Sequence, residues 1–202
     1  MKKTRKNSKI EHRKPEILEN YYQVIIKEGI EGASIAKIAR RMNIHPSLII
    51  HYFKTKHNLT VELFDLLIER YAAPEFFQHD RIKDPHQRFK TLMDILFSFE
   101  YSRTVDPGVH FGFYYLSFRN KEINKRFREM INQLKVLLVK EFEKFKKEGI
   151  ITVKDTGQAA NMVVTLIEGL EFQTAFLDQN KKFEDFAEQS KRLAIAFLTG
   201  AI

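Results

Sequence analysis

Cysteine is absent from the chain. This absence excludes disulfides, thiolate metal sites and cysteine nucleophiles, and it fits the reducing cytoplasm, where we expect the protein to be. No apolar run approaches the ~18–20 residues that a membrane span needs, and no apolar stretch typical of a secretory signal follows the basic N-terminus. The sequence has only 5 prolines and 8 glycines in 202 residues and no alternating strand pattern, so it predicts an all-α protein.

Acidic residues are scarce at the N-terminal end. Residues 1–60 contain 13 Lys or Arg against 5 Asp or Glu, whereas the remaining residues contain 21 of each. The whole net charge of +8 therefore lies in the first third of the chain. A small basic domain attached to a larger neutral one indicates that the first part binds a polyanion. The lysines and arginine of a basic arm over 1–10 also fit a tail that merely aids solubility.

Helical periodicity starts within the basic region. Apolar residues recur at helical spacing over 11–28, and Gly29 stands where a helix would stop. Ser34 is a good N-cap for a second helix over 35–41. Asn43 then supplies a residue that tolerates the left-handed conformation of a tight turn.

A third helix over 46–51 follows this turn, because Pro46 suits the first turn of a helix. Thr55 is expected to cap the next helix, which we extend to about Phe77. Two short helices joined by a tight turn, the second with a polar exposed face, are typical of a helix-turn-helix. The sequence thus predicts an N-terminal helix-turn-helix domain of three helices and a larger C-terminal helical domain.

The stretch from Ile17 to Leu59 resembles the DNA-binding domain of TetR-family repressors. The resemblance rests on Gly29, on Ser34-Ile35-Ala36-Lys37-Ile38-Ala39, on Ile44-His45-Pro46-Ser47 and on Tyr52-Phe53-Lys54-Thr55-Lys56. The segment over 46–53 is closer to the branch that contains the choline-responsive repressor BetI than to the tetracycline repressor. Asn43 replaces the usual turn glycine, and Ile50 stands where many members carry a phosphate-contacting tyrosine.

The resemblance implies that the helix over 46–51 enters the major groove of DNA. Candidates for base contacts are His45, Pro46, Ser47, Ile50 and His51. Candidates for phosphate contacts are Ser34, Lys37, Tyr52, Lys54 and Lys56. For Leu48 and Ile50 core packing is an equal alternative, and we expect Phe53 in the core with Tyr52 facing phosphate.

Apolar periodicity in the remaining two thirds of the chain predicts five more helices. We place them over 85–103, 107–118, 120–148, from Asp155 or Thr156 to about 177, and over 183–199. In the family that the chain resembles, the last two helices pair with those of a second subunit. Both are apolar over a wide face here, which predicts a homodimer. The expected interface residues are Val163, Ile167, Leu170, Leu193 and Phe197.

Aromatic residues indicate where a small-molecule effector would bind. The candidate lining residues are Phe97, Tyr101, Phe111, Phe113, Tyr114, Tyr115 and Phe118. Such residues form either an apolar pocket or a cage for a quaternary ammonium, and an aromatic stripe also occurs in an ordinary core. The sequence does not choose between an alkyl chain, an aromatic compound and choline.

These features together predict a DNA-binding transcriptional repressor. We expect a helix-turn-helix domain over 1–56 and an effector-binding and dimerisation domain over 57–202. A small effector, either apolar or aromatic or cationic, is expected to release the protein from double-stranded operator DNA. The alternative is a helical protein that binds RNA or an anionic membrane surface through its basic N-terminus. An enzyme is less favoured, because no catalytic motif is present. We expect no cofactor and no metal, although His79, Asp80, Asp84 and His86 lie close in sequence.

Overall fold

The computed structural model describes residues 2–71, 81–177 and 182–201, and within 2–12 it describes the backbone alone. These residues form helices and contain no strand, so the predicted all-α fold is confirmed. The chain divides into two compact units. The first comprises residues 1–70 and 105–127, and the second comprises 71–104 and 128–202. The predicted domains, 1–56 and 57–202, differ in extent from these units and remain a prediction about function.

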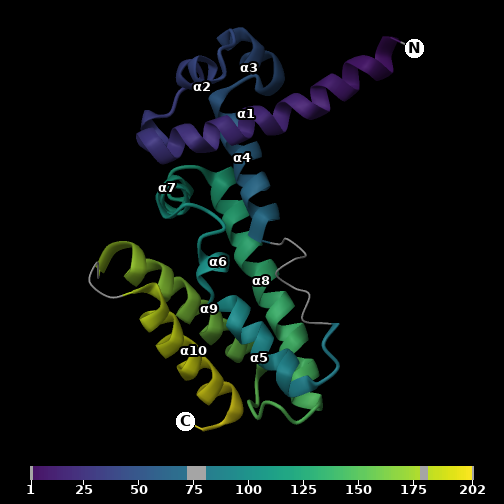
Figure 1. The fold of residues 1–202 in the computed structure, drawn as a ribbon, viewed down its shortest axis with the longest axis vertical. Helices are drawn as coiled ribbons and strands as arrows, with labels where there is room; N and C mark the ends of the chain where they lie inside the picture. The colour runs from purple at the N-terminus through teal and green to yellow at the C-terminus, as the bar shows by residue number, and fades with distance from the viewer. Residues whose placement is uncertain (1, 72–80, 178–181, 202) are drawn as a thin grey trace. The chain divides into compact units, whose positions relative to one another are not determined.

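The first unit is built around α1 (Lys2–Gly32), against which α2 (Ile35–Met42) and α3 (Pro46–Phe53) pack (Figure 1). α4 (Lys56–Tyr71), α7 (Pro107–Ser117) and the start of α8 (Lys121–Lys147) complete this unit. Its core contains fully buried aliphatic and aromatic side chains, namely Ile17, Tyr21, Ile38, Ile49, Leu59 and Leu63. Because α7 and the start of α8 return to this core, the unit is not a continuous stretch of sequence.

Local capping rules explain most helix ends in this unit. Ser34 caps α2 by accepting a hydrogen bond from the Lys37 amide, and the Thr55 hydroxyl accepts one from the Asn58 amide at the start of α4. Gly29 adopts a φ of 73°, which interrupts the helix where a stop was predicted, although one further turn follows it. α1 begins at Lys2, earlier than the predicted residue 11.

The second unit contains α5 (Pro85–Leu96), the short α6 (Phe99–Ser102), most of α8, α9 (Thr156–Phe172), a π-helical turn (Gln173–Leu177) and α10 (Phe183–Thr199). Its core gathers Leu92 and Met93 from α5, Leu138, Phe142 and Phe145 from α8, and residues of α9 and α10. Asp155 caps α9 by accepting from two amides, and Gly149 follows α8 with a φ of 74°. Both ends agree with the sequence prediction.

One predicted helix is divided in the structure, and the end of another cannot be compared. The single helix expected over 85–103 is two helices, α5 and α6, because the backbone of Ser98 is extended and its hydroxyl accepts a hydrogen bond from the Tyr101 amide. This cap starts a new helix in the middle of an apolar periodic segment. α4 is described to Tyr71, and its predicted end near Phe77 lies outside the described residues.

The turn between α2 and α3 yields a test of local stability. Asn43 adopts the left-handed conformation, with φ 52° and ψ 47°. We expect Asn43→Gly to be neutral or slightly stabilising and Asn43→Val to destabilise the protein by about 1–2 kcal/mol, because a β-branched side chain is disfavoured there. Urea unfolding followed by circular dichroism measures both.

The control for this test is Asn132→Gly, an exposed position inside α8. It should lower stability by several tenths of a kcal/mol, because glycine is a poor residue within a helix. Equal losses from Asn43→Gly and Asn132→Gly would contradict the left-handed assignment of Asn43.

Candidate nucleic-acid interface

α3 buries one side and presents the other to solvent. Ile49 is 0% exposed and Phe53 lies in the core, which agrees with the predicted role of Phe53. Ile50 is 46% exposed, so its side chain is available for apolar contact. His45, Ser47 and His51 are exposed, and Pro46 and Tyr52 are half-buried. The five candidates for base contacts therefore lie on or beside the solvent-facing side of one helix.

His45 has a structural role that orients its ring. It is the N-cap of α3, and its Nδ1 accepts a hydrogen bond from the Ser47 amide at 3.3 Å. The same Nδ1 lies 2.7 Å from the Ser47 hydroxyl. An accepting Nδ1 carries no proton in the neutral ring, so Nε2 carries it. His45 then offers Nε2–H as a donor, which suits guanine N7 or O6.

The candidates for phosphate contacts lie at the helix ends around α3. Lys37 on α2 is 2.8 Å from a Glu28 carboxylate oxygen, and this hydrogen bond is the main cause that lowers the pKa of Glu28. Such part-exposed pairs are weak and can exchange for a phosphate. Lys54 donates to the carbonyl of His51 at 3.0 Å, and Lys56 approaches the carbonyl of Ile30 at 3.5 Å. Ser34 remains able to donate its hydroxyl proton while its oxygen caps α2.

Arg40, a basic residue of the helix-turn-helix, is a further candidate for a phosphate contact. It is exposed on α2, and no ion pair or hydrogen bond of its side chain is found among the described residues. Arg41, by contrast, donates through Nε to the Asn20 side chain at 3.0 Å. In the sequence these are simply two adjacent arginines. The fold distinguishes them, because the Arg41 side chain has a hydrogen-bond partner in α1.

The seven effector-pocket candidates do not gather in one unit. Phe97 and Tyr101 are buried in the second unit, whereas Phe111, Phe113, Tyr114, Tyr115 and Phe118 belong to α7 and its end in the first. Phe113 packs in the core, with its ring centroid 4.7 Å from that of Phe64. Phe118 is 82% exposed, and the Tyr115 hydroxyl donates to Glu31 at 2.5 Å. A common pocket for all seven remains a prediction.

Acidic groups surround Tyr101 in the second unit. Burial, with the negative charges of Glu168 and Glu171, raises the pKa of Tyr101 to about 12. Burial also raises the pKa of Glu171, although its hydrogen bonds with Ser102 and Arg103 oppose this. The Tyr71 ring packs edge-on against Tyr101, with centroids 5.9 Å apart. Burial disfavours any unpaired charge here, and Arg103 already pairs with Glu171 at 3.1 Å.

The expected dimer residues divide into buried and accessible groups. Val163, Ile167 and Leu170 of α9 are buried within the core of the second unit, so the chain covers these three by itself. Their place on a dimer interface remains a prediction. Leu193 of α10 is 48% exposed and Phe197 is half-buried. Periodicity identified an apolar helix but could not say which side another part of the same chain would cover.

The residues considered for a metal site do not form one within the described part of the chain. Asp84 caps α5 by accepting from the His86 amide at 3.1 Å, and His79 and Asp80 lie outside the described residues. No group of three potential metal ligands occurs among the residues that were described. Within those same ranges, no helix is long and apolar enough to cross a membrane.

The capped α2, the left-handed turn and the solvent-facing α3 place this chain in the class of helix-turn-helix DNA-binding proteins. A family model described as bacterial regulatory proteins of the tetR family matches residues 17–63. A second model, the tetracyclin repressor-like C-terminal domain, matches residues 84–199. The chain belongs to the TetR family of transcription regulators, and it is a regulator and not an enzyme.

Solved structures of similar fold agree with this assignment. A TetR transcription regulator from Haloarcula marismortui is 20% identical, covers 94% of this chain and 98% of its own, and superposes with a TM-score of 0.81. A transcriptional regulator from Saccharomonospora viridis in complex with choline is 16% identical over 91% and 95% of the two chains, with a TM-score of 0.78. The fatty acid degradation regulator FadR from Bacillus halodurans is 18% identical over 91% and 94%, with a TM-score of 0.70. Among curated proteins, no sequence matches the chain significantly.

Proposed function

We propose that this protein is a cytoplasmic transcriptional repressor that binds operator DNA as a homodimer and leaves it when a small molecule binds. The observation that carries this proposal is the presentation of α3, which buries Ile49 and Phe53 and turns His45, Ser47 and His51 to solvent. An eight-residue helix with donors on its open side suits the major groove. We retain residues 1–56 as the DNA-binding domain and propose that it belongs to the BetI-like branch.

The contacts divide into two kinds. Ser34, Lys37, Tyr52, Lys54 and Lys56 would bind phosphates and set the register of the domain on the duplex. His45, Pro46, Ser47, Ile50 and His51 would read base edges, with Ile50 against a thymine methyl. In a dimer the two α3 helices would read a pseudo-palindrome whose half-sites lie about one helical turn apart, ~34–36 Å.

This division of contacts is testable on DNA selected by the wild-type protein from a randomised pool. Lys56→Ala should weaken binding to selected and random duplexes alike and reduce the slope of log affinity against log salt by about one, because it removes one phosphate contact. Ser47→Ala and His51→Ala should cost about 1–3 kcal/mol on the selected duplex and leave random DNA nearly unchanged. Fluorescence anisotropy at two salt concentrations measures all three.

Circular dichroism of each variant is the control for an intact α3. Equal losses on both duplexes for Ser47→Ala and His51→Ala would show that α3 does not read the sequence. An RNA duplex and anionic vesicles are included in the same assay. Stronger wild-type binding to either of them than to selected DNA would favour the alternative function.

The dimer interface is proposed to use the exposed apolar stripe of α9 and α10. Met162, Gly169, Phe172 and Phe176 follow one another at spacings close to whole helical turns, and Leu193 is exposed on α10, which packs against α9. A Cβ added at Gly169 would meet no atom within 4 Å, so a second helix can approach closely there. The family supports this use of the two last helices, and a second copy of the chain would cover the stripe.

Charged substitutions on this stripe should separate the subunits. We expect Leu193→Glu to give a folded monomer by light scattering and to weaken binding to the palindromic duplex, because burying an unpaired charge in the interface is costly. Val136→Glu is the matched control, since Val136 is 61% exposed on α8. It should remain a dimer. A monomeric wild type, or a Leu193→Glu dimer with full affinity, would refute the interface.

The effector is proposed to carry a positive charge. Tyr71 and Tyr101 pack edge-to-face, and the negative charges of Glu168 and Glu171 act on Tyr101, with Arg103 pairing Glu171 at 3.1 Å. Aromatic side chains next to acidic groups attract alkylammonium ions. The similar regulator that was solved with choline supports this alternative over the purely apolar one.

Thermal unfolding with two added compounds tests the charge of the effector. Choline at 100 times its Kd should stabilise the protein by about 2.7 kcal/mol, a rise in Tm of roughly 5–10 °C. Glu168→Gln should abolish the rise, whereas Glu184→Gln, an exposed change on α10, should retain it. A rise with a fatty acid and none with choline would favour an apolar effector instead.

A further inference from the structure

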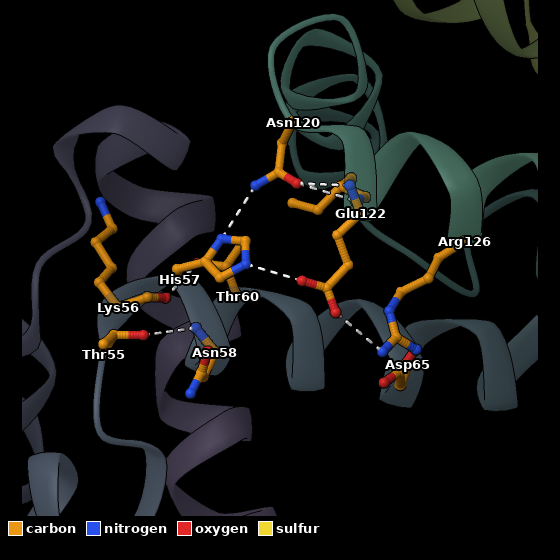
Figure 2. Close-up of polar contacts among 10 residues, drawn as sticks. Thr55, Lys56, His57, Asn58, Thr60, Asp65, Asn120, Glu122 and Arg126 are labelled. Carbon is orange, nitrogen blue, oxygen red and sulfur yellow. Dashed lines mark hydrogen bonds and ion pairs between the residues drawn. The ribbon is translucent and has the colours of Figure 1, made fainter.

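Five polar side chains join the start of α4 to the start of α8 (Figure 2). His57 and Asp65 come from α4, whereas Asn120, Glu122 and Arg126 come from the start of α8. The Asn120 amide nitrogen is 3.0 Å from His57 Nδ1, and His57 Nε2 is 2.9 Å from a Glu122 carboxylate oxygen. Arg126 lies 2.6 Å from the Asp65 carboxylate and 3.4 Å from that of Glu122. We call these five residues the α4–α8 clamp.

The orientation of Asn120 determines the state of His57. The Asn120 side-chain oxygen accepts hydrogen bonds from the amides of Glu122 and Ile123 at 3.0 and 3.1 Å, so it caps α8. Its NH₂ group must therefore point toward His57, and His57 Nδ1 must accept. The remaining nitrogen, Nε2–H, donates to Glu122. Both ring nitrogens thus have partners within the protein while the capped end of α8 stays beside α4.

The carboxyl groups of the clamp respond to these contacts. The hydrogen bond from His57 is the main cause that lowers the pKa of Glu122. Partial burial raises the pKa of Asp65, and the charge and hydrogen bond of Arg126 oppose this effect. The ring of Phe64 stacks with that of Phe127, with centroids 5.9 Å apart. These two residues directly adjoin Asp65 and Arg126 in sequence, so an apolar contact accompanies that ion pair.

The clamp adjoins the proposed phosphate contact. His57 directly follows Lys56, the first residue of α4. On the opposite side, the Thr60 hydroxyl donates to the Lys56 carbonyl at 2.8 Å and accepts from the Tyr21 hydroxyl at 2.8 Å. The first turn of α4 is consequently tied both to α1 and to α8. Its position, and that of Lys56, depends on where the start of α8 lies.

α8 belongs to both compact units. Its residues to Phe127 lie in the first, and those from Arg128 onward lie in the second, where Leu138, Phe142 and Phe145 are core residues. We propose that the α4–α8 clamp positions Lys56 for its DNA phosphate, so that DNA affinity depends on the place of α8. This inference rests on the proposed DNA-binding function and assigns a positioning role to His57, Asn120 and Glu122.

The sign of one substitution distinguishes positioning from simple electrostatics. Glu122→Gln removes a negative charge near DNA, and by electrostatics alone it should tighten binding. Positioning predicts the reverse, a loss of about threefold on selected and random duplexes alike, the scale of a part-exposed ion pair. The double variant His57→Ala/Glu122→Gln should lose less than the sum of the two single variants, because both changes affect the contact of His57 with Glu122. Anisotropy well below the Tm of each variant measures these affinities.

Glu62→Gln is the matched control. It removes one carboxylate from α4 and one interhelical pair, that of Lys14 and Glu62 at 2.8 Å, but leaves the clamp intact. It should bind DNA as well as the wild type or more tightly. Hydrogen exchange should be faster at the amides of 57–60 in Glu122→Gln and unchanged there in Glu62→Gln.

The outcomes separate this inference from the function on which it rests. Wild-type protein that binds no duplex would overturn the proposed function itself. Wild-type protein that binds normally, with Glu122→Gln as tight as Glu62→Gln, would overturn the positioning role alone. Equal losses in both variants would show a general stabilising effect on α4 and would also overturn it.

Discussion

The packing of Ile49 and Phe53 is the constraint on which the DNA-facing surface depends. α3 has only eight residues, and a helix of this length is not stable by itself in water. It exists because these two side chains are buried in the core of the first unit. The same burial fixes the rotation of α3 about its axis and therefore decides that His45, Ser47 and His51 face solvent.

Hydrogen bonds fix the positions of the helices that pack around this core. His45 and Thr55 satisfy the open amides at the starts of α3 and α4, and Asn43 turns the chain between α2 and α3. Across the unit, Tyr21 meets Thr60, and Tyr22 accepts a hydrogen bond from the Asp106 amide at 2.7 Å. Each such contact is modest in energy. Together they hold α1, α4 and α7 in a single arrangement, which a protein that reads DNA by geometry requires.

The second unit differs from the first in that charged groups lie beside its core. The core is apolar and aromatic, and Tyr101, Glu171 and Arg103 add charge and hydrogen bonds to it. The Arg103 guanidinium lies over the rings of Phe99 and Phe183, at 5.4 and 5.2 Å from their centroids, and 3.1 Å from Glu171. Burying such groups costs stability unless they are paired. The pair of Arg103 and Glu171 meets this requirement within the chain itself.

Features that depend on near neighbours in the chain could be predicted without the structure. Ser34, Asn43 and Thr55 act as caps or turn residues through contacts within a few positions, and so do Gly149 and Asp155, so the helices and the helix-turn-helix could be predicted. The break at Ser98 was missed because its cap competes with an apolar periodicity that continues through it. In that case two local signals conflicted.

Which surfaces remain exposed to solvent depends on how distant segments of the chain pack together. Val163 and Leu193 carry the same apolar signal, but the core of the same chain covers the first and leaves the second exposed. Likewise His57 and Glu122 are 65 residues apart, and no local rule relates them. Burial and long-range pairing depend on which helix packs against which, and that choice is made by the sum of many weak contacts over the whole unit.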